Sequence, residues 1–249
     1  MTGAPFTTWL EALEQRHLAD LTRAEVIRAL RALSSCYVER RSRLSSALDG
    51  AGKRAAFALY YAPLHYLVVD RIVRGIPEAT KDVREIVDVG CGTGAAGAAW
   101  GAACDTAPKL HGVDRHPWAV AEATRTYREF GLRGRATVGD AARAPLGRAW
   151  GSAAIIAYTV NELPPPAREA LLGRVKDAAR TGARVLIVEP VARGAAPWWD
   201  AWQHALGARE DEWRFPLELP ALPRELARGA GLEPRELIAR SLFVSREPV

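Results

Sequence analysis

A glycine-rich loop that follows an acidic residue carries most of the chemical information in this sequence. The apolar run 86–89 contains Asp88 and leads into Gly90, Gly92 and Gly94, after which the chain is rich in alanine. An apolar run of this length predicts a buried parallel strand, and the glycines after it predict a tight turn. Because glycine has no side chain, such a turn lets the backbone approach a ligand closely.

A second acidic residue stands where a doubly wound sheet binds ribose. The short apolar run 110–113 ends in Asp114, which follows Gly94 by twenty residues and precedes Arg115. An acid at the end of the second strand, at this distance from the loop, is placed to accept hydrogen bonds from ribose hydroxyls. The loop and the acid together indicate a cofactor that contains a nucleoside.

Two classes of nucleoside cofactor fit the loop. Residues 92–97 satisfy the G-x-G-x-x-G pattern of NAD-dependent dehydrogenases. The run 88–92, however, places its first glycine one step earlier and resembles the first motif of class I methyltransferases, which use S-adenosylmethionine (SAM). We favour SAM because Asp114 and Asp140 also agree with that family in order and spacing. The alternative without a ligand is a tight strand-to-helix turn.

The resemblance implies a role for each residue of the site. The loop passes under the methionine part of SAM, and Asp88 helps to orient the ammonium group. Asp114 binds the ribose diol and Asp140 the adenine amino group. Trp118 either stacks on adenine or packs its helix. The predicted cofactor-binding residues are Asp88, Gly90, Cys91, Gly92, Gly94, Asp114, Arg115, Trp118, Asp140, Ala141 and Tyr158.

Asn161 and Glu162 are the leading candidates on the acceptor side. They follow the predicted fourth strand, where class I methyltransferases present polar groups beside the transferred methyl. Both residues could instead cap the next helix or hold its loop. The pattern differs from the Asn/Asp-Pro-Pro-aromatic box of amino-methylases, because the prolines 164–166 come later and no aromatic residue follows them.

Two further catalytic candidates lie on a predicted helix before the first core strand. His65 and Tyr66 could belong to a lid over the cofactor, with His65 as a base. The alternative for His65 is a packed or hydrogen-bonded structural role. The proposed catalytic residues are therefore Asn161, Glu162, His65 and Tyr66.

The order of elements predicts an α/β fold. Residues 1–80 form a helical lobe, in which Thr22 and Glu25 have the spacing of a capping box. The expected strands are 85–89, 109–113, 135–138, 153–158 and 183–188, with helices at 94–102, 117–130 and 165–180 between them. A helix from 222 and strands at about 235–240 and 242–246 end the chain. This alternation predicts a Rossmann-like, seven-stranded and mostly parallel sheet in a core of residues 81–249.

A Trp-rich segment, 191–221, interrupts the core on the expected acceptor side. Four of its residues between 198 and 213 are tryptophans. They either line an acceptor pocket or pack a helix onto the core, and packing is the usual role of such clusters.

Three further segments, 61–67, 158–164 and 186–190, resemble the methyltransferase-like family named for a mitochondrial small-ribosomal-subunit assembly factor. This resemblance implies ribosomal RNA as the methyl acceptor, or a SAM-binding assembly factor without catalysis. Typical members carry C-terminal cysteines thought to hold an iron–sulfur cluster, whereas this chain has no cysteine after Cys104. A small-molecule acceptor therefore stays open beside RNA.

Composition indicates a globular protein of 249 residues with a net charge of +5. The excess is concentrated in residues 21–74, where ten Lys and Arg face four Asp and Glu. That segment either meets an anionic partner such as RNA or is a solvated helix surface. Three cysteines without paired spacing predict neither a disulfide framework nor a metal site. The sequence shows no signal peptide and no membrane span, and we expect a cytoplasmic protein.

Overall fold

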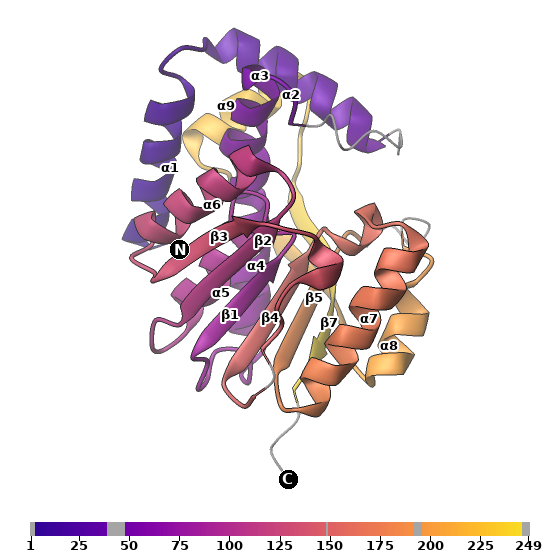
Figure 1. Ribbon diagram of the computed structural model, residues 1–249. Helices are drawn as coiled ribbons and strands as arrows, with labels where there is room; N and C mark the ends of the chain where they lie inside the picture. Colours follow the sequence, from indigo (N-terminus) through magenta and orange to yellow (C-terminus); the bar gives the residue numbers. More distant parts are fainter. Residues whose placement is uncertain (1–2, 39–47, 148, 192–195, 246–249) are drawn as a thin grey trace. The chain divides into compact units, whose positions relative to one another are not determined.

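The computed structural model describes residues 3–38, 48–147, 149–191 and 196–245 (Figure 1). Its contacts divide the chain into two compact units. One unit contains residues 1–65 and 216–237, and the other contains residues 66–215 and 238–249. The predicted glycine loop and the acids after it all fall in the second unit.

A single seven-stranded sheet has the order β3-β2-β1-β4-β5-β7-β6. Its strands are β1 (Glu85–Val89), β2 (Lys109–Asp114), β3 (Gly134–Val138), β4 (Ser152–Ala157), β5 (Arg184–Glu189), β6 (Arg209–Pro216) and β7 (Glu236–Val244). Strands β1 to β5 are parallel, and β7 runs antiparallel to β5. The predicted seven-stranded, mostly parallel sheet is confirmed, and the carboxyl ends of β1 to β5 meet at one edge.

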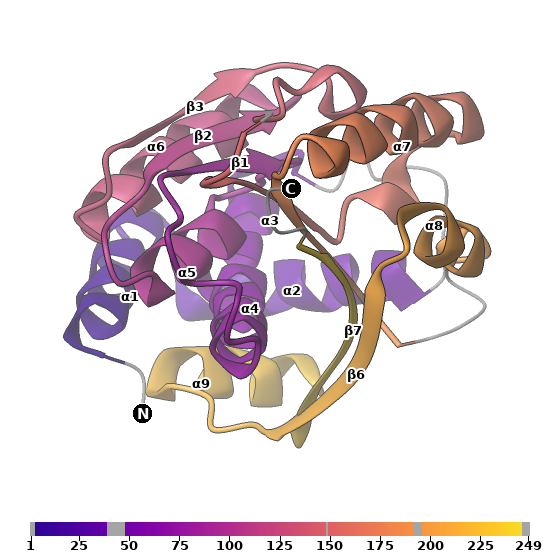
Figure 2. The same ribbon diagram turned by 90° about the horizontal axis from the view of Figure 1, so that it is seen from below.

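Helices cover the two faces of this sheet unequally. Figure 2 shows α5 (Ala95–Ala103) and α6 (Pro117–Glu129) beside β1 to β3. On the other face, α7 (Pro165–Arg180) and α8 (Trp199–Leu206) pack with β4 and β5 in one hydrophobic cluster (Figure 1). The helix α4 (Ala62–Gly75) precedes β1. The link between β3 and β4 contains only one short turn, η3 (Ala141–Arg143), in its described residues.

The smaller unit is helical and includes a segment from the C-terminal part of the chain. It holds α1 (Ala4–His17), α2 (Arg23–Val38), α3 (Ala51–Ala56), the π-helical turn η2 (Phe57–Tyr61) and α9 (Ala221–Ala230). The capping box is present: the Thr22 backbone N–H donates to the Glu25 carboxylate at 2.8 Å, and the Glu25 N–H donates to the Thr22 hydroxyl at 3.3 Å. Residues 39–47 of the basic segment lie outside the described residues.

The boundary between the two units lies inside α4, between residues 65 and 66. We had predicted it at about residue 80 from the sequence. The smaller unit also takes α9, because α9 packs on α2. Arg31 of α2 donates to the Gly229 carbonyl at 2.7 Å, and Arg23 pairs with Glu225 at 2.7 Å. A Cβ on Gly229 would lie 2.5 Å from the Ile27 side chain. The apolar stripe of α2 is thus packed against α9, which comes from a distant part of the sequence.

The predicted pair of terminal strands is wrong. Residues 236–244 form one continuous strand, β7, and its edge neighbour is β6 from the Trp-rich segment. The turn that we placed near residue 241 is absent because Ser241 is buried and accepts a hydrogen bond from the Trp213 indole at 2.9 Å. The alternation of Trp213 and Phe215 with charged residues in β6 was the signal for this strand.

The other three tryptophans of that segment pack in the core. Trp198, Trp199 and Trp202 are at most 8% exposed and join the hydrophobic cluster of β4, β5 and α7. The packing interpretation is therefore correct for these residues. No helix in the described part of the chain is long and apolar enough to cross a membrane.

Candidate functional site

The glycine loop is tied to the end of β2. The backbone N–H groups of Gly90 and Cys91 both donate to the Val113 carbonyl, at 2.8 and 3.0 Å. Gly90, Gly92 and Gly94 have φ values of +66°, +49° and +79°. This left-handed backbone favours glycine. The loop therefore forms the predicted tight turn at the carboxyl edge of the sheet.

Thr159 holds the same loop from the β4 side. Its hydroxyl lies 3.2 Å from the Val89 carbonyl and 3.0 Å from the Ala157 carbonyl. A Cβ on Gly90 would overlap the Thr159 side chain. The first glycine is thus required for two reasons, its left-handed φ and this close approach. No local sequence pattern predicts this role of Thr159, which depends on the neighbouring positions of β1 and β4 in the sheet.

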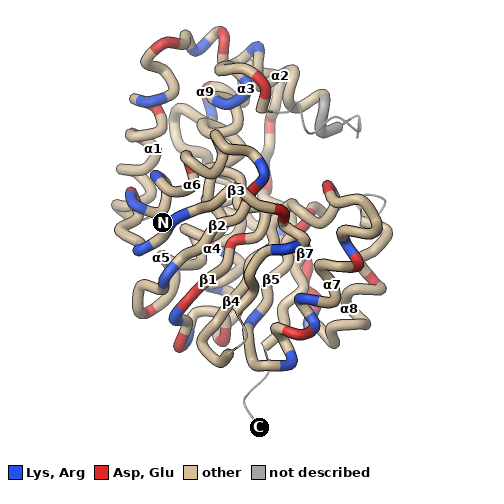
Figure 3. The backbone as a smooth tube through the Cα atoms, in the orientation of Figure 1, with Lys and Arg blue, Asp and Glu red and all other residues tan. Residues whose placement is uncertain are grey.

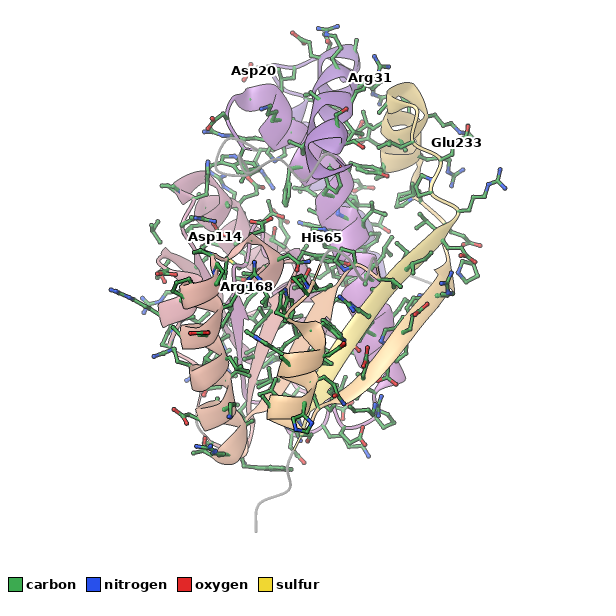
Figure 4. All side chains as sticks on the ribbon, turned by 90° about the vertical axis from the view of Figure 1, so that its right-hand side faces the viewer. Asp20, Arg31, His65, Asp114, Arg168 and Glu233 are labelled. Carbon is green, nitrogen blue, oxygen red and sulfur yellow. The ribbon has the colours of Figure 1, made fainter. Side chains whose placement is uncertain are left out.

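Asp114, which is labelled in Figure 4, is the last residue of β2 and is hydrogen-bonded to the loop that follows β1. One carboxylate oxygen accepts from the Gly92 N–H at 2.9 Å, and the other accepts from the His116 N–H at 2.8 Å. Each carboxylate oxygen can accept more than one hydrogen bond, so this half-buried side chain retains acceptors for a vicinal diol. The residues present therefore fit the nucleoside of SAM.

Asp88 lies beneath the loop and is 1% exposed. Its Oδ2 accepts from the Gly97 N–H at 2.9 Å and from the Tyr127 hydroxyl at 3.0 Å. Burial raises the pKa of the Asp88 carboxyl to about 7, against these two hydrogen bonds, which lower it. Asp88 thus links β1 to α5 and α6 through Gly97 and Tyr127, while its predicted contact with the ammonium of SAM stays a prediction.

The free energy of unfolding of the wild type should fall as the pH rises from 4 to 7, and we expect Asp88→Asn to remove this fall. The folded protein holds the Asp88 proton up to about pH 7, whereas the unfolded chain releases it near its ordinary pKa of 3.8, so the free energy of unfolding of the wild type falls as pH rises through this window. Asparagine does not titrate, and its oxygen can keep both hydrogen bonds.

Urea unfolding at several pH values measures this effect. At about 1.4 kcal/mol per pKa unit, the gain of the variant over the wild type should grow by on the order of 3 kcal/mol from pH 4 to pH 8. Parallel pH profiles for the two proteins would contradict the buried, protonated state of Asp88.

The predicted adenine side contains exposed and half-buried residues. Asp140 caps η3, with its Oδ1 accepting from the Ala142 N–H at 2.9 Å. Ala141 is partly buried against the core cluster. Trp118 is half-buried, and its ring meets His116 edge-on at 6.2 Å. These residues lie after β2 and β3 at the same edge as Asp114, and their contacts with adenine stay predictions.

Tyr158 has an unusual backbone at the end of β4. Its φ is +55°, and its N–H donates to the Val188 carbonyl at 2.9 Å. A bulky residue in the left-handed region is strained, and such strain is concentrated at functional sites. Burial and the nearby Glu189 raise the pKa of the Tyr158 phenol, so the hydroxyl stays protonated. The strained turn directs the chain from β4 towards Asn161.

Asn161 is held in a buried hydrogen-bond network. Its side-chain amide donates to Glu189 at 2.8 Å, and its carbonyl oxygen accepts from the Trp198 indole at 2.9 Å. Glu189 is 1% exposed at the end of β5. Burial raises the pKa of Glu189 to about 8. The network favours the loop-holding role for Asn161. Glu189 was not among our predicted site residues. Its position as an acid at the end of a buried strand was the signal that could have identified it.

Glu162 is the exposed partner of this pair. Desolvation by neighbouring protein raises the pKa of its carboxyl to about 7, the Arg115 charge lowers it, and the Asp114 charge raises it again. The side chain is exposed to solvent, so water screens its charge and moderates this rise. Glu162 follows β4 at the carboxyl edge of the sheet, the edge at which β2 ends in Asp114.

His65 and Tyr66 belong to different units. His65 lies in the helical unit, where its ring meets Phe57 edge-on at 6.0 Å, and burial lowers its pKa to about 4. Tyr66 is 5% exposed and stacks on Phe130 at 4.9 Å. These contacts favour a packing role for both residues, so we do not carry them into the proposed mechanism.

No group of three His, Cys, Asp or Glu residues in the described ranges is arranged to hold a metal ion. Cys91 lies in the glycine loop as a buried free thiol, and Cys104 is also free. Burial raises the pKa of the Cys91 thiol, so it stays neutral beneath the site.

Comparisons with known proteins agree with this fold. Residues 86–182 match the family model of a methyltransferase domain. No curated protein sequence gives a significant match to the chain. A candidate O-methyltransferase of Nostoc punctiforme PCC 73102 is similar in structure at 14% identity, with 96% of this chain and 72% of that chain covered and a TM-score of 0.54. This likeness shows the class I methyltransferase fold.

Two other solved structures have lower scores. An N-methyltransferase of Bradyrhizobium japonicum WM9 in complex with S-adenosyl-L-homocysteine gives 13% identity over 73% of this chain and 86% of that chain, with a TM-score of 0.47. A candidate RNA methyltransferase of Pyrococcus horikoshii gives 13% identity over 80% and 86%, with a TM-score of 0.48. The domain match indicates SAM as the cofactor. The closer resemblance to the ribosomal assembly family is not confirmed by these matches and stays a prediction.

Proposed function

We propose that this protein transfers a methyl group from SAM to an acceptor held beside Glu162. The observation that carries the proposal is the meeting of three features at one edge of the sheet: the left-handed glycine loop, Asp114 and the loop after β4. In open α/β sheets, ligands bind beyond the carboxyl ends of the strands. The domain match over residues 86–182 supports the same reaction class.

The residues of the chain would share the work as follows. The glycine loop and Asp114 hold the cofactor, whose sulfonium supplies an electrophilic methyl group. Asn161, Glu189 and Trp198 fix the loop after β4, so that the acceptor is positioned by a rigid support. Positioning of two reactants can supply a large share of the rate enhancement.

Glu162 is the proposed general base. A carboxylate whose pKa is raised towards neutrality can accept a proton near physiological pH. A base is needed only where the acceptor atom carries a proton at that pH, as a hydroxyl group does. We therefore propose an acceptor that is deprotonated during methyl transfer, on either RNA or a small molecule.

Glu162→Gln is expected to reduce turnover at least tenfold while SAM affinity changes little, because a lost general base costs about 100-fold or more when proton transfer limits the rate. Turnover is measured with methyl-labelled SAM, and SAM affinity by calorimetry. The exposed Glu169 at the start of α7 offers a matched control, Glu169→Gln, which should leave both quantities unchanged. Full turnover of Glu162→Gln would contradict the role of Glu162.

A second candidate is a SAM-binding assembly factor without catalysis, as the ribosomal resemblance implies. The engagement of Asn161 by Glu189 and Trp198 favours it, because Asn161 is then part of a structural network. Methyl transfer to any acceptor that Asp114→Ala abolishes would reject this candidate. The remote dehydrogenase alternative predicts NAD binding in place of SAM binding.

A further inference from the structure

A groove lies at the opposite edge of the sheet from the proposed cofactor site. It is lined by the first residues of β1, β2 and β3 and by Pro145, and its volume is about 600 Å³. Strands of five or six residues rise about 3.3 Å per residue, so roughly 16 to 20 Å separates the two edges. The groove is thus a separate place on the same unit.

The groove exists because no helix covers this face of β2 and β3 in the described part of the chain. The helices α5 and α6 cover the other face (Figure 2), and the one helical turn in the described residues of the β3–β4 link is η3. This face carries both polar and apolar strand residues, and Val87 and Val113 on it are buried in the hydrophobic cluster. His111 and Thr137 are joined there by a 2.9 Å hydrogen bond.

The charge in the groove is predominantly positive. Lys109, Arg133 and Arg135 line it and are exposed, and none forms an ion pair within the described residues. Lys109 is the first residue of β2, and Arg133 and Arg135 lie at the start of β3. Figure 3 colours the Lys and Arg positions along the backbone blue. The single acid of the lining, Glu85, accepts a hydrogen bond from the Ser152 hydroxyl at 2.6 Å. Three cations without an ion pair among the described residues thus line one concave space.

We propose that this groove binds a small polyphosphate-bearing ligand, either a free polyphosphate anion or the phosphate tail of a nucleotide. Lys and Arg are the side chains that bind phosphate oxygens through charge-assisted hydrogen bonds. The volume lies within the range of small-molecule sites. The three cations line one concavity, an arrangement that suits a compact anion better than a long polyanionic strand. This inference does not depend on the methyl-transfer reaction.

The test uses calorimetric titration of the full chain with tripolyphosphate, with ATP and with a single-stranded oligonucleotide, at low salt. Saturable binding of tripolyphosphate is expected, because a free polyphosphate and the phosphate tail of a nucleotide present the same oxygens to the three cations. If ATP binds with the same affinity as tripolyphosphate, the groove recognises the polyphosphate alone. If ATP binds more tightly, the groove also recognises the nucleoside. The imidazole NMR signals of His111, identified with His111→Asn, should shift on binding.

A triple variant, Lys109→Ala/Arg133→Ala/Arg135→Ala, should bind at least about tenfold more weakly, since three charged hydrogen-bond donors are lost. The matched control, Arg71→Ala/Lys81→Ala/Arg128→Ala, removes the same residue types from exposed positions outside the groove and should bind as the wild type does. Thermal melting checks that both variants fold.

Four results would overturn the proposal. They are no binding of tripolyphosphate by the wild type, equal loss in both triple variants, displacement of tripolyphosphate by SAM, and binding of the oligonucleotide without binding of tripolyphosphate or ATP. SAM displacement would place the anion at the carboxyl edge. A failure of methyl transfer would affect none of these results, so the two proposals fail separately.

Discussion

Asp114→Ala is expected to weaken SAM binding more than tenfold. The side chain is proposed to accept both ribose hydroxyls in charge-assisted hydrogen bonds, which are worth about 1.5 to 3 kcal/mol each. It also holds the Gly92 and His116 N–H groups, so its loss loosens the loop and the turn after β2. Calorimetric titration with SAM measures the effect.

Two controls show whether the effect depends on the negative charge of Asp114 and on its position in the chain. Asp114→Asn keeps one acceptor oxygen and should lose less affinity than Asp114→Ala. Asp105→Ala removes an exposed acid from the turn after α5 and should bind SAM as the wild type does. Unchanged affinity in Asp114→Ala would refute the ribose assignment.

Gly90→Ala should abolish SAM binding and destabilise the fold. The new methyl group would overlap Thr159, and alanine would have to adopt a φ of +66°. Overpacking costs about 1 to 3 kcal/mol, and left-handed strain adds about 1 to 2 kcal/mol. Urea unfolding should therefore show a loss of about 3 kcal/mol.

Gly131→Ala provides the matched control for this strain. Gly131 has a φ of +68°, but an added Cβ would have no neighbour within 4 Å. This variant should lose about 1 kcal/mol from backbone strain alone and should bind SAM normally. Equal losses in the two glycine variants would show that contact with Thr159 does not matter.

The sequence predicted the parallel part of the fold well because two periodic signals agree there. Apolar runs of five or six residues alternate with helical patterns from Glu85 to Glu189, and each expected strand lies within about one residue of the observed one. The antiparallel edge was harder to predict. In β6 the alternation of charged residues with Trp213 and Phe215 was hidden by the aromatic content of the segment.

The candidate site was only partly predictable for a similar reason. Glycines and strand-end acids have local signals, so the loop and Asp114 could be placed from spacing. Tyr127, Thr159 and Trp198 act through contacts between residues 37 to 70 positions apart in the chain. No local pattern encodes such contacts. The different surroundings of Asn161 and Glu162, one buried in a network and one exposed, likewise depend on β5 and α8.

Methyl transfer itself tests the central claim most directly. The protein is incubated with methyl-labelled SAM and two acceptor pools, small-subunit ribosomal RNA with its particles and a low-mass cell extract, with Asp114→Ala as the inactive control. We predict that label enters one pool with the wild type and neither pool with Asp114→Ala. Absence of label from both pools, in a protein shown to bind SAM, would contradict catalysis and favour the assembly-factor alternative.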